Sequence, residues 1–130
     1  MTCVYDSLIK YLKNEDLIKI SNKVNPTPKE LIKSLKDQNY FTMNVLHQGK
    51  ELSIREIKEN YVTFGSVDIN KLGNGYLVSG CEPLFLLIVY ILKIRIEHNY
   101  NGAMIVYEPS YRLGKVRYKI RLNSSRTHMY

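Results

Sequence analysis

The clearest structural signal lies in residues 82–107, which have the sequence EPLFLLIVYILKIRIEHNYNGAMIVY. Glu82 and Pro83 suit the first turn of a helix, where a carboxylate meets the positive end of the helix dipole and proline sacrifices no hydrogen bond. Every residue from Leu84 to Leu92 is then apolar or aromatic. Because a helix that is apolar on all sides has to be buried, we expect residues 84–92 to form the central helix of the core.

The residues that follow this helix indicate β-structure. Ile94 and Ile96 alternate with charged neighbours, which is typical of a strand with one buried face. The pair Asn101-Gly102 is a strong signal for a tight hairpin turn, since both residue types tolerate positive φ. The sequence therefore predicts a hairpin whose returning strand covers residues 103–107.

A third strand is predicted over residues 115–122, after a loop that begins at Pro109. The alternation places Val116, Tyr118, Ile120 and Leu122 on one face and Lys115, Arg117, Lys119 and Arg121 on the other. This period of two predicts a strand with one apolar and one basic face. We expect the strands after the central helix to form an antiparallel meander.

Helices dominate the predictions for the N-terminal half. The apolar residues of 4–12 form a helical stripe. Two more helices are predicted from capping boxes, at residues 27–30 (Thr-Pro-Lys-Glu) and at residues 53–56 (Ser-Ile-Arg-Glu). Residues 40–46 are predicted to be extended. No repeat or linker divides the chain, so we predict a single domain over residues 1–130, of the α+β class, with N-terminal helices packed on a C-terminal antiparallel sheet.

The composition is that of an ordinary soluble domain. Of the 130 residues, 45% are hydrophobic and 24% are charged. The longest apolar run, from Pro83 to Leu92, is about half of the ~20 residues that a membrane-spanning helix needs, and no leading apolar segment marks a signal peptide. Two cysteines without a Cys/His cluster argue against a disulfide scaffold and a zinc finger. We therefore expect a cytoplasmic protein with no metal and no membrane partner.

The positive charge is concentrated in one part of the chain. The formal net charge is +7, and residues 109–130 hold six Lys/Arg and no Asp or Glu. Since cationic surfaces attract phosphate groups, nucleic acid is a predicted partner. The residues predicted to contact it are Arg112, Lys115, Arg117, Lys119 and Arg121. The alternative is a solvated edge strand whose cations block pairing with other sheets.

Two residues at opposite ends of the chain suggest thiol chemistry. Cys3 precedes the first predicted helix, and the positive end of the helix dipole favours a nucleophilic thiolate. His128 follows the last predicted strand and would reach Cys3 as its base if that strand runs back beside the first helix. The alternative is a small buried cysteine and a histidine at a frayed chain end.

Three segments resemble those of a known family. Residues 2–8, Thr-Cys-Val-Tyr-Asp-Ser-Leu, resemble the cysteine box of papain-like cysteine proteases, especially the OTU (ovarian-tumour) deubiquitinases. Residues 75–84, Gly-Tyr-Leu-Val-Ser-Gly-Cys-Glu-Pro-Leu, are similar to the middle of that family, where a Gly/aromatic segment leads into a Glu-Leu-containing helix and a short strand. The ending His128-Met129-Tyr130 fits the same order, because the family closes on a strand ending in a histidine near an aromatic residue.

This resemblance implies an OTU-like papain-type fold and a cysteine protease of the deubiquitinase type, in a short viral-type member of the family. It implies Cys3 as the nucleophile and His128 as the base, with no cofactor. We predict that Asn123 orients the histidine, since the family's orienting carboxylate has no counterpart beside His128. The implied substrates are ubiquitin, a ubiquitin-like protein or a viral polyprotein, in the host cytosol.

The alternative is that the protein has an OTU-like fold without catalytic activity. OTU enzymes usually carry a Gly-Asp-Gly-Asn-like loop before the cysteine, whose backbone helps to form the oxyanion hole, and here Met1 and Thr2 precede Cys3. Loss of such donors costs about 10²–10³-fold in rate. The alternative is therefore an inactive OTU-like fold that serves as a structural (virion) component, or that binds nucleic acid or protein through the basic C-terminal strand.

Four other residues were considered as candidates for a site. Cys81 precedes the apolar central helix and is predicted to be a small buried hydrophobe. His47 and His98 adjoin turn-like segments and are predicted to lie on the surface. Glu82 is predicted to stabilise the N-terminus of the central helix.

Overall fold

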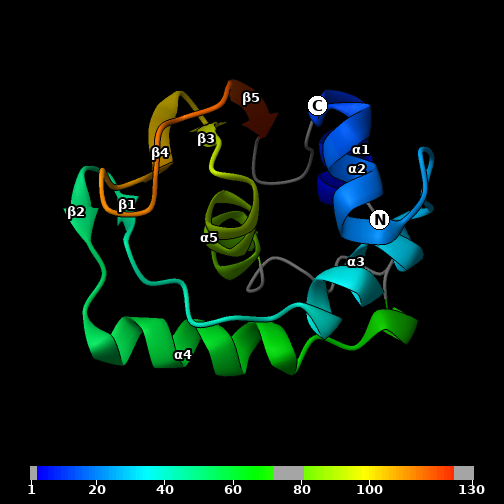
Figure 1. The fold of residues 1–130 in the computed structure, drawn as a ribbon, viewed down its shortest axis with the longest axis horizontal. Coiled ribbons are helices and arrows are strands. Elements are labelled where there is room, and N and C mark those ends of the chain that lie inside the picture. Colours follow the sequence, from blue (N-terminus) through cyan, green and yellow to red (C-terminus); the bar gives the residue numbers. More distant parts are fainter. Residues whose placement is uncertain (1–2, 72–80, 125–130) are drawn as a thin grey trace.

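The computed structural model describes residues 3–71 and 81–124 of the chain (Figure 1). These residues form a mixed α+β structure with five α-helices, one 3₁₀ turn and a five-stranded sheet, so the predicted α+β class is confirmed. In chain order the elements are α1 (Cys3–Tyr11), α2 (Asn14–Ser21), α3 (Pro28–Asp37), β1 (Val45–His47), β2 (Lys50–Glu51), α4 (Ile54–Gly65), η1 (Ile69–Lys71), α5 (Cys81–Leu92), β3 (Arg95–Tyr100), β4 (Ala103–Pro109) and β5 (Lys119–Ser124).

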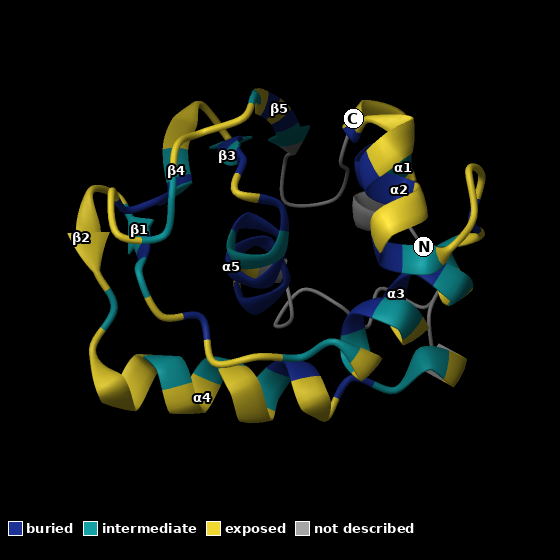
Figure 2. Ribbon diagram, in the orientation of Figure 1, coloured by how far each residue is buried: buried dark blue, intermediate teal, exposed yellow. Residues whose placement is uncertain are grey.

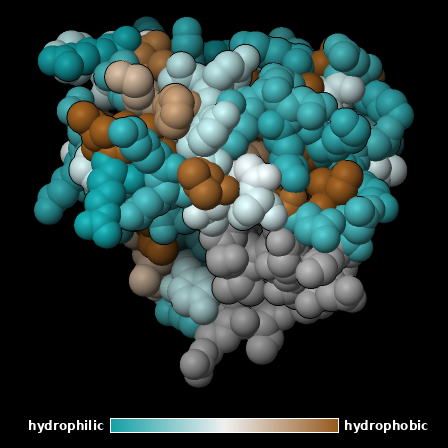
Figure 3. All heavy atoms as spheres, turned by 90° about the horizontal axis from the view of Figure 1, so that it is seen from below, coloured by the Kyte–Doolittle hydropathy of each residue, from teal (hydrophilic) through white to brown (hydrophobic). Residues whose placement is uncertain are grey.

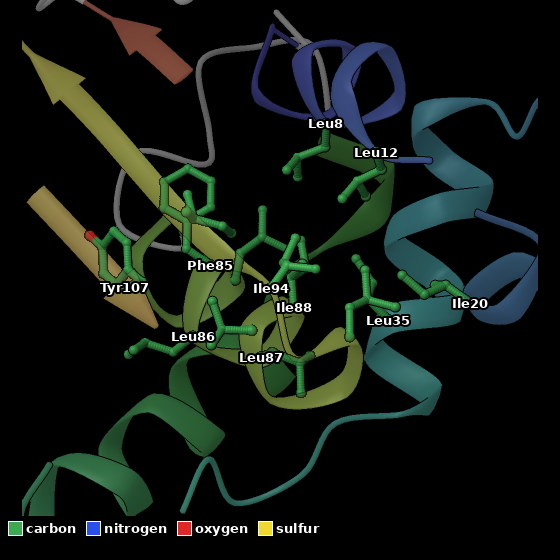
Figure 4. Packing of buried hydrophobic residues seen from close by; sticks show 14 of the residues in the cluster. Leu8, Leu12, Ile20, Leu35, Phe85, Leu86, Leu87, Ile88, Ile94 and Tyr107 are labelled. Carbon is green, nitrogen blue, oxygen red and sulfur yellow. The ribbon is translucent and has the colours of Figure 1, made fainter. Parts of the chain in front are cut away.

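Helix α5 is the centre of the core, as the apolar run predicted. It packs against β1, β3 and β4 on one side and against α4 on another, and its ribbon is almost entirely buried (Figure 2). Figure 4 shows Leu8 of α1, Leu12 just after α1 and Leu35 of α3 pointing toward Ile88 of α5. Because each buried aliphatic side chain contributes about 1.5–3 kcal/mol, packing around α5 is the largest source of stability in the fold.

The predicted hairpin is confirmed. β3 and β4 pair antiparallel, with Tyr100 opposite Ala103 at the turn. Asn101 and Gly102 have φ angles of 50° and 87°. Positive φ at both central positions matches the right-handed twist of the flanking strands, which explains why this dipeptide closes the hairpin.

The last strand differs from the prediction in direction and in length. The sheet order is β2-β1-β4-β3-β5, and β5 pairs with β3 in parallel, so the sheet is mixed rather than antiparallel throughout. Residues 115–118 are not part of the strand, because they cross the C-terminal end of α5 before β5 begins. There the Arg117 N–H donates to the Lys93 carbonyl (2.9 Å), and Val116 is 38% exposed rather than buried.

Both predicted capping boxes are present. Thr27 accepts a hydrogen bond from the Glu30 N–H, and Ser53 accepts one from the Glu56 N–H, at 3.1 Å in each case. Each glutamate in turn accepts the N–H of its cap residue at 3.0 Å. These reciprocal bonds satisfy N–H groups that have no partner within the helix, and they fix where α3 and α4 begin.

Two elements of the N-terminal half depart from the predictions. Helix α2 was not predicted, because Lys13 at its N-cap forms no side-chain capping bond and the helix has only eight residues. It is held instead by burial of Leu17 and Ile20. Of the predicted extended segment 40–46, only the end is a strand, since β1 begins at Val45.

One buried carboxylate joins distant parts of the chain. Asp16 of α2 is 2% exposed and accepts hydrogen bonds from Arg117 Nη1 (2.9 Å) and from the Tyr118 hydroxyl. The same Arg117 nitrogen donates to the Leu92 carbonyl at the end of α5 (3.0 Å). The Lys13 N–H donates to the Tyr118 hydroxyl (3.3 Å). Helix α2, the end of α5 and the chain entering β5 therefore meet at Asp16.

We predict that Asp16→Asn lowers the free energy of unfolding by about 2 kcal/mol, because the buried carboxylate loses its charge-assisted hydrogen bonds from Arg117 and Tyr118, while Arg117 keeps its ion pair with Glu15. Urea denaturation monitored by far-UV circular dichroism measures the change. Asp37→Asn is the matched control, since Asp37 pairs with Lys33 on the surface with both side chains about two-thirds exposed. Its expected loss is below about 0.5 kcal/mol. Equal losses in the two variants would contradict a structural role for Asp16.

Candidate functional site

Cys3 is the first residue of α1, one residue earlier than the predicted start of the helix, and its side chain lies outside the part that the structure describes. His128 also lies outside the described residues, as do residues 75–80 of the segment that resembles the OTU family. The predicted meeting of Cys3 and His128 requires the last strand to run beside the first helix. Helix α1 and β5 do contact each other, and in Figure 1 the arrow of β5 points toward the side of the molecule where α1 lies.

The contact between α1 and β5 has a defined anchor. Lys13, two residues after α1, donates its N–H to the hydroxyl of Tyr118, the residue before β5. The Lys13 ammonium also lies over the Tyr118 ring, 4.6 Å from its centroid. This anchor holds the end of α1 to the start of β5. The opposite ends of the two elements, which are the first residue of α1 and the last residue of β5, therefore lie away from it. The nine-residue helix spans about 13 Å and the six-residue strand about 20 Å.

Asn123, the predicted orienting residue, is half-buried in β5. Ile120 and Leu122 are buried in the core, so the alternation of side chains along the strand places Asn123 on the opposite face of the sheet. Its neighbour in register is Asn99 of β3, whose side-chain carbonyl is buried without a hydrogen-bond partner in the described part. The structure thus brings Asn123 next to Asn99, and its relation to His128 stays a prediction.

The predicted basic face is interrupted by acidic partners from other elements. Arg121 donates to Glu97 of β3 from Nη2 (2.8 Å) and from Nε (3.1 Å). Glu97 is only 6% exposed, and the hydrogen bonds from Arg121 and Arg95 hold the pKa of its carboxyl below the usual range. Arg117 is not in the strand at all and pairs with Asp16. Two of the five predicted nucleic-acid contacts are therefore already neutralised within the fold.

A group of polar and aromatic side chains gathers at the start of α5. His47 Nδ1 lies 3.2 Å from Glu82 Oε1, and the His47 ring stacks on Tyr107 with centroids 5.1 Å apart and planes 2° apart. A carboxylate at one ring nitrogen fixes the orientation of an imidazole, as acid–base chemistry requires. No local sequence pattern indicates this pair, because β1 and α5 come together only in the tertiary structure.

His98 belongs to the same neighbourhood, and its predicted surface position is wrong. It is 8% exposed in β3 and meets the Phe85 ring edge-on, with centroids 5.3 Å apart. Burial lowers the pKa of the His98 imidazole, since a charged ring would lose its hydration. The alternation of side chains along a strand could have predicted this burial. Ile94, Ile96 and His98 are two residues apart, so they lie on the same face, and Ile94 and Ile96 also face the core.

The face on which α4 lies carries a shallow hollow of about 300 Å³, lined by Lys58, Glu59, Val62 and Thr63. Figure 3 views this face, where hydrophobic side chains form separate patches among hydrophilic ones. Phe41 and Tyr61 stack there with centroids 4.5 Å apart, and both remain more than one-third exposed. The hollow's only charged lining residues are Lys58 and Glu59, which are neighbours on the same helix, and such a pair does not define a chemical site.

The described residues contain no group of three or more His, Cys, Asp and Glu side chains that could hold a metal ion. Within the same residues, no helix combines the length and the apolar character that crossing a membrane requires. Comparisons of the chain with models of protein families, with curated proteins and with solved structures found no match. Function is therefore inferred from the residues and their geometry.

We predict that stability falls as the pH is lowered from about 7.5 to about 5.5, because the pKa of His98 is lower in the folded state than in the unfolded chain, where it is about 6.5. The unfolded state then binds the extra proton, and the slope from one such group is at most about 1.4 kcal/mol per pH unit. Urea denaturation across this range measures the slope.

The slope assigned to His98 should flatten in His98→Gln. It should persist in His47→Gln, which removes another imidazole and leaves His98 in place. This range lies above the titration of the carboxyl groups, whose pKa values are lowered at Glu30, Glu56 and Glu97. An unchanged slope in His98→Gln would show that another group is responsible.

Proposed function

We propose that the protein is a cysteine protease of the deubiquitinase type with an OTU-like fold. Its substrates would be ubiquitin or ubiquitin-like conjugates, or viral polyprotein junctions, in the host cytosol. Cys3 would act as the nucleophile, His128 as the base and Asn123 as the residue that orients the base. The observation that carries the proposal is the anchored contact between α1 and β5.

This contact supports the proposal through the direction of the two elements. Because Lys13 and Tyr118 hold the end of α1 to the start of β5, the first residue of α1 and the last residue of β5 both point away from that anchor. Cys3 is the first residue of α1, and His128 follows the last residue of β5 by four positions in the sequence. An antiparallel β5, as predicted from the sequence, would direct the chain toward the opposite end of the sheet.

The start of α1 also favours the required chemistry at Cys3. In the proposed reaction, His128 takes the thiol proton and the Cys3 thiolate attacks the carbonyl carbon of the scissile amide. The C–N bond breaks, and the imidazolium returns the proton to the leaving amine. Water then attacks the thioester with His128 as base, the C–S bond breaks, and the carboxylic acid product leaves. The positive end of the α1 dipole stabilises the thiolate in the first step.

We predict that a ubiquitin probe with a cysteine-reactive group at its C-terminus labels the wild-type protein at Cys3. Cys3→Ala should abolish the adduct, and His128→Ala should slow its formation, because the thiol loses its base. Intact-mass spectrometry measures the adduct. Cys81→Ala is the matched control, since it removes the only other cysteine, which also starts a helix, and it should label like wild type.

Two results would count against the proposed protease. Labelling that survives Cys3→Ala and disappears in Cys81→Ala would assign the reactive thiol to α5. No adduct from the folded protein between about pH 6 and about pH 9, a range in which cysteine thiols ionise, would favour the inactive OTU-like alternative.

A further inference from the structure

Three cationic side chains and one exposed aromatic ring lie at the loop between β4 and β5. We call these residues, Lys93, Tyr111, Arg112 and Lys115, the loop cluster. Arg112 and Lys115 belong to the loop itself, and Lys93 follows α5. The Lys93 side chain lies over the loop, because a Cβ placed on Gly114 would stand 3.2 Å from Lys93 Cδ and 3.7 Å from Lys93 Nζ. Lys93 is therefore a neighbour of the loop that carries Arg112 and Lys115, although it comes from another part of the chain.

The cations of the loop cluster have no acidic partner among the described residues. Three carboxylates of β3, β4 and α2 are engaged by other residues. Glu108, which ends β4, accepts from Arg95 Nη1 (3.0 Å), and Glu97 accepts from Arg95 and Arg121. Asp16 accepts from Arg117. The fold thus pairs Arg117 and Arg121 with acids, and it leaves Lys93, Arg112 and Lys115 exposed without an ion pair.

Tyr111 gives the loop cluster a second kind of contact. Its side chain is 85% exposed, more than any other large hydrophobic residue in the described part. The Arg112 guanidinium lies 5.7 Å from the ring centroid, and its Nε donates to the Tyr111 hydroxyl (3.2 Å). An exposed ring that carries a cation at its side offers a surface on which a base can stack while a neighbouring phosphate is neutralised.

We propose that the loop cluster binds single-stranded nucleic acid. Lys93, Arg112 and Lys115 contact phosphates, and Tyr111 stacks on an unpaired base. A single strand fits better than a duplex, because the base faces of a duplex are already stacked on one another. The loop cluster shares Arg112 and Lys115 with the contacts predicted from the sequence. It replaces Arg117 and Arg121, which form ion pairs, with Lys93 and Tyr111. It is also independent of the proposed protease, so Cys3→Ala should bind nucleic acid as wild type does.

Fluorescence anisotropy with a labelled oligouridylate of about 12 nucleotides tests this site, since non-specific single-strand sites cover about 4–16 nucleotides. The triple variant Lys93→Gln/Arg112→Gln/Lys115→Gln should reduce the magnitude of the slope of log K against log salt by about 2, because each phosphate contact contributes about 0.7. Tyr111→Ala should weaken binding about tenfold, whereas Tyr111→Phe keeps the stacking ring and should bind nearly as wild type.

A matched control separates the loop cluster from net charge alone. Lys19→Gln/Lys29→Gln/Lys50→Gln removes the same charge from exposed lysines that form no ion pair within the described residues. This control should retain most of the affinity, and unchanged circular dichroism checks that each variant is folded. Equal losses in the two triple variants would overturn the proposal, as would wild-type binding in Tyr111→Ala. Binding to vesicles rich in phosphatidylserine without binding to the oligonucleotide would also overturn it and assign the cluster to a membrane surface.

Discussion

The arrangement of the chain depends on the Arg117 guanidinium, which donates hydrogen bonds to two acceptors. Either acceptor would destabilise the fold if it had no hydrogen-bond partner. One is the Asp16 carboxylate, which α2 buries almost completely. The other is the Leu92 carbonyl at the end of α5, where unpaired carbonyls carry the negative end of the helix dipole. Because one side chain serves both, the chain must pass the end of α5 before it enters the sheet. That route makes β5 start beside Arg95 and run parallel to β3.

The same constraint governs where positive charge remains on the surface. A strand of alternating cations would be expected to form a positive stripe, yet parallel pairing places Arg121 directly opposite Glu97. Arg95 lies on the other side of that carboxylate, so two guanidinium groups share one buried acid. Near this end of the sheet, the crossing loop and Lys93 keep cations that form no ion pair within the described residues. Arg117 and Arg121 are therefore neutralised by acids, while Arg112 and Lys115 of the preceding loop keep their charge.

Features set by neighbouring residues were predictable, and features set by distant residues were not. The capping boxes at Thr27 and Ser53, the Asn101-Gly102 turn and the apolar run of α5 all act within a few positions of the chain. Helix α2 and the direction of β5 depend on Asp16 meeting Arg117 across 101 positions, which no local pattern records. Of the candidate site, helical periodicity predicted the first helix to within one residue of its start at Cys3. The burial of His98 was implied by strand parity, and the pairing of His47 with Glu82 was not.

The two proposed activities lie at opposite ends of one strand. The loop cluster precedes Lys119, where β5 begins, and the chain leads to His128 only after Ser124, where β5 ends. Six strand residues span about 20 Å, roughly the width of a small domain's core. An extended peptide entering near the start of α1 would therefore leave the loop cluster uncovered, and a short nucleic acid on the loop would leave the thiol accessible. Since Asp16 and Arg117 hold the chain where β5 begins, both ends of the strand depend on this one ion pair for their position.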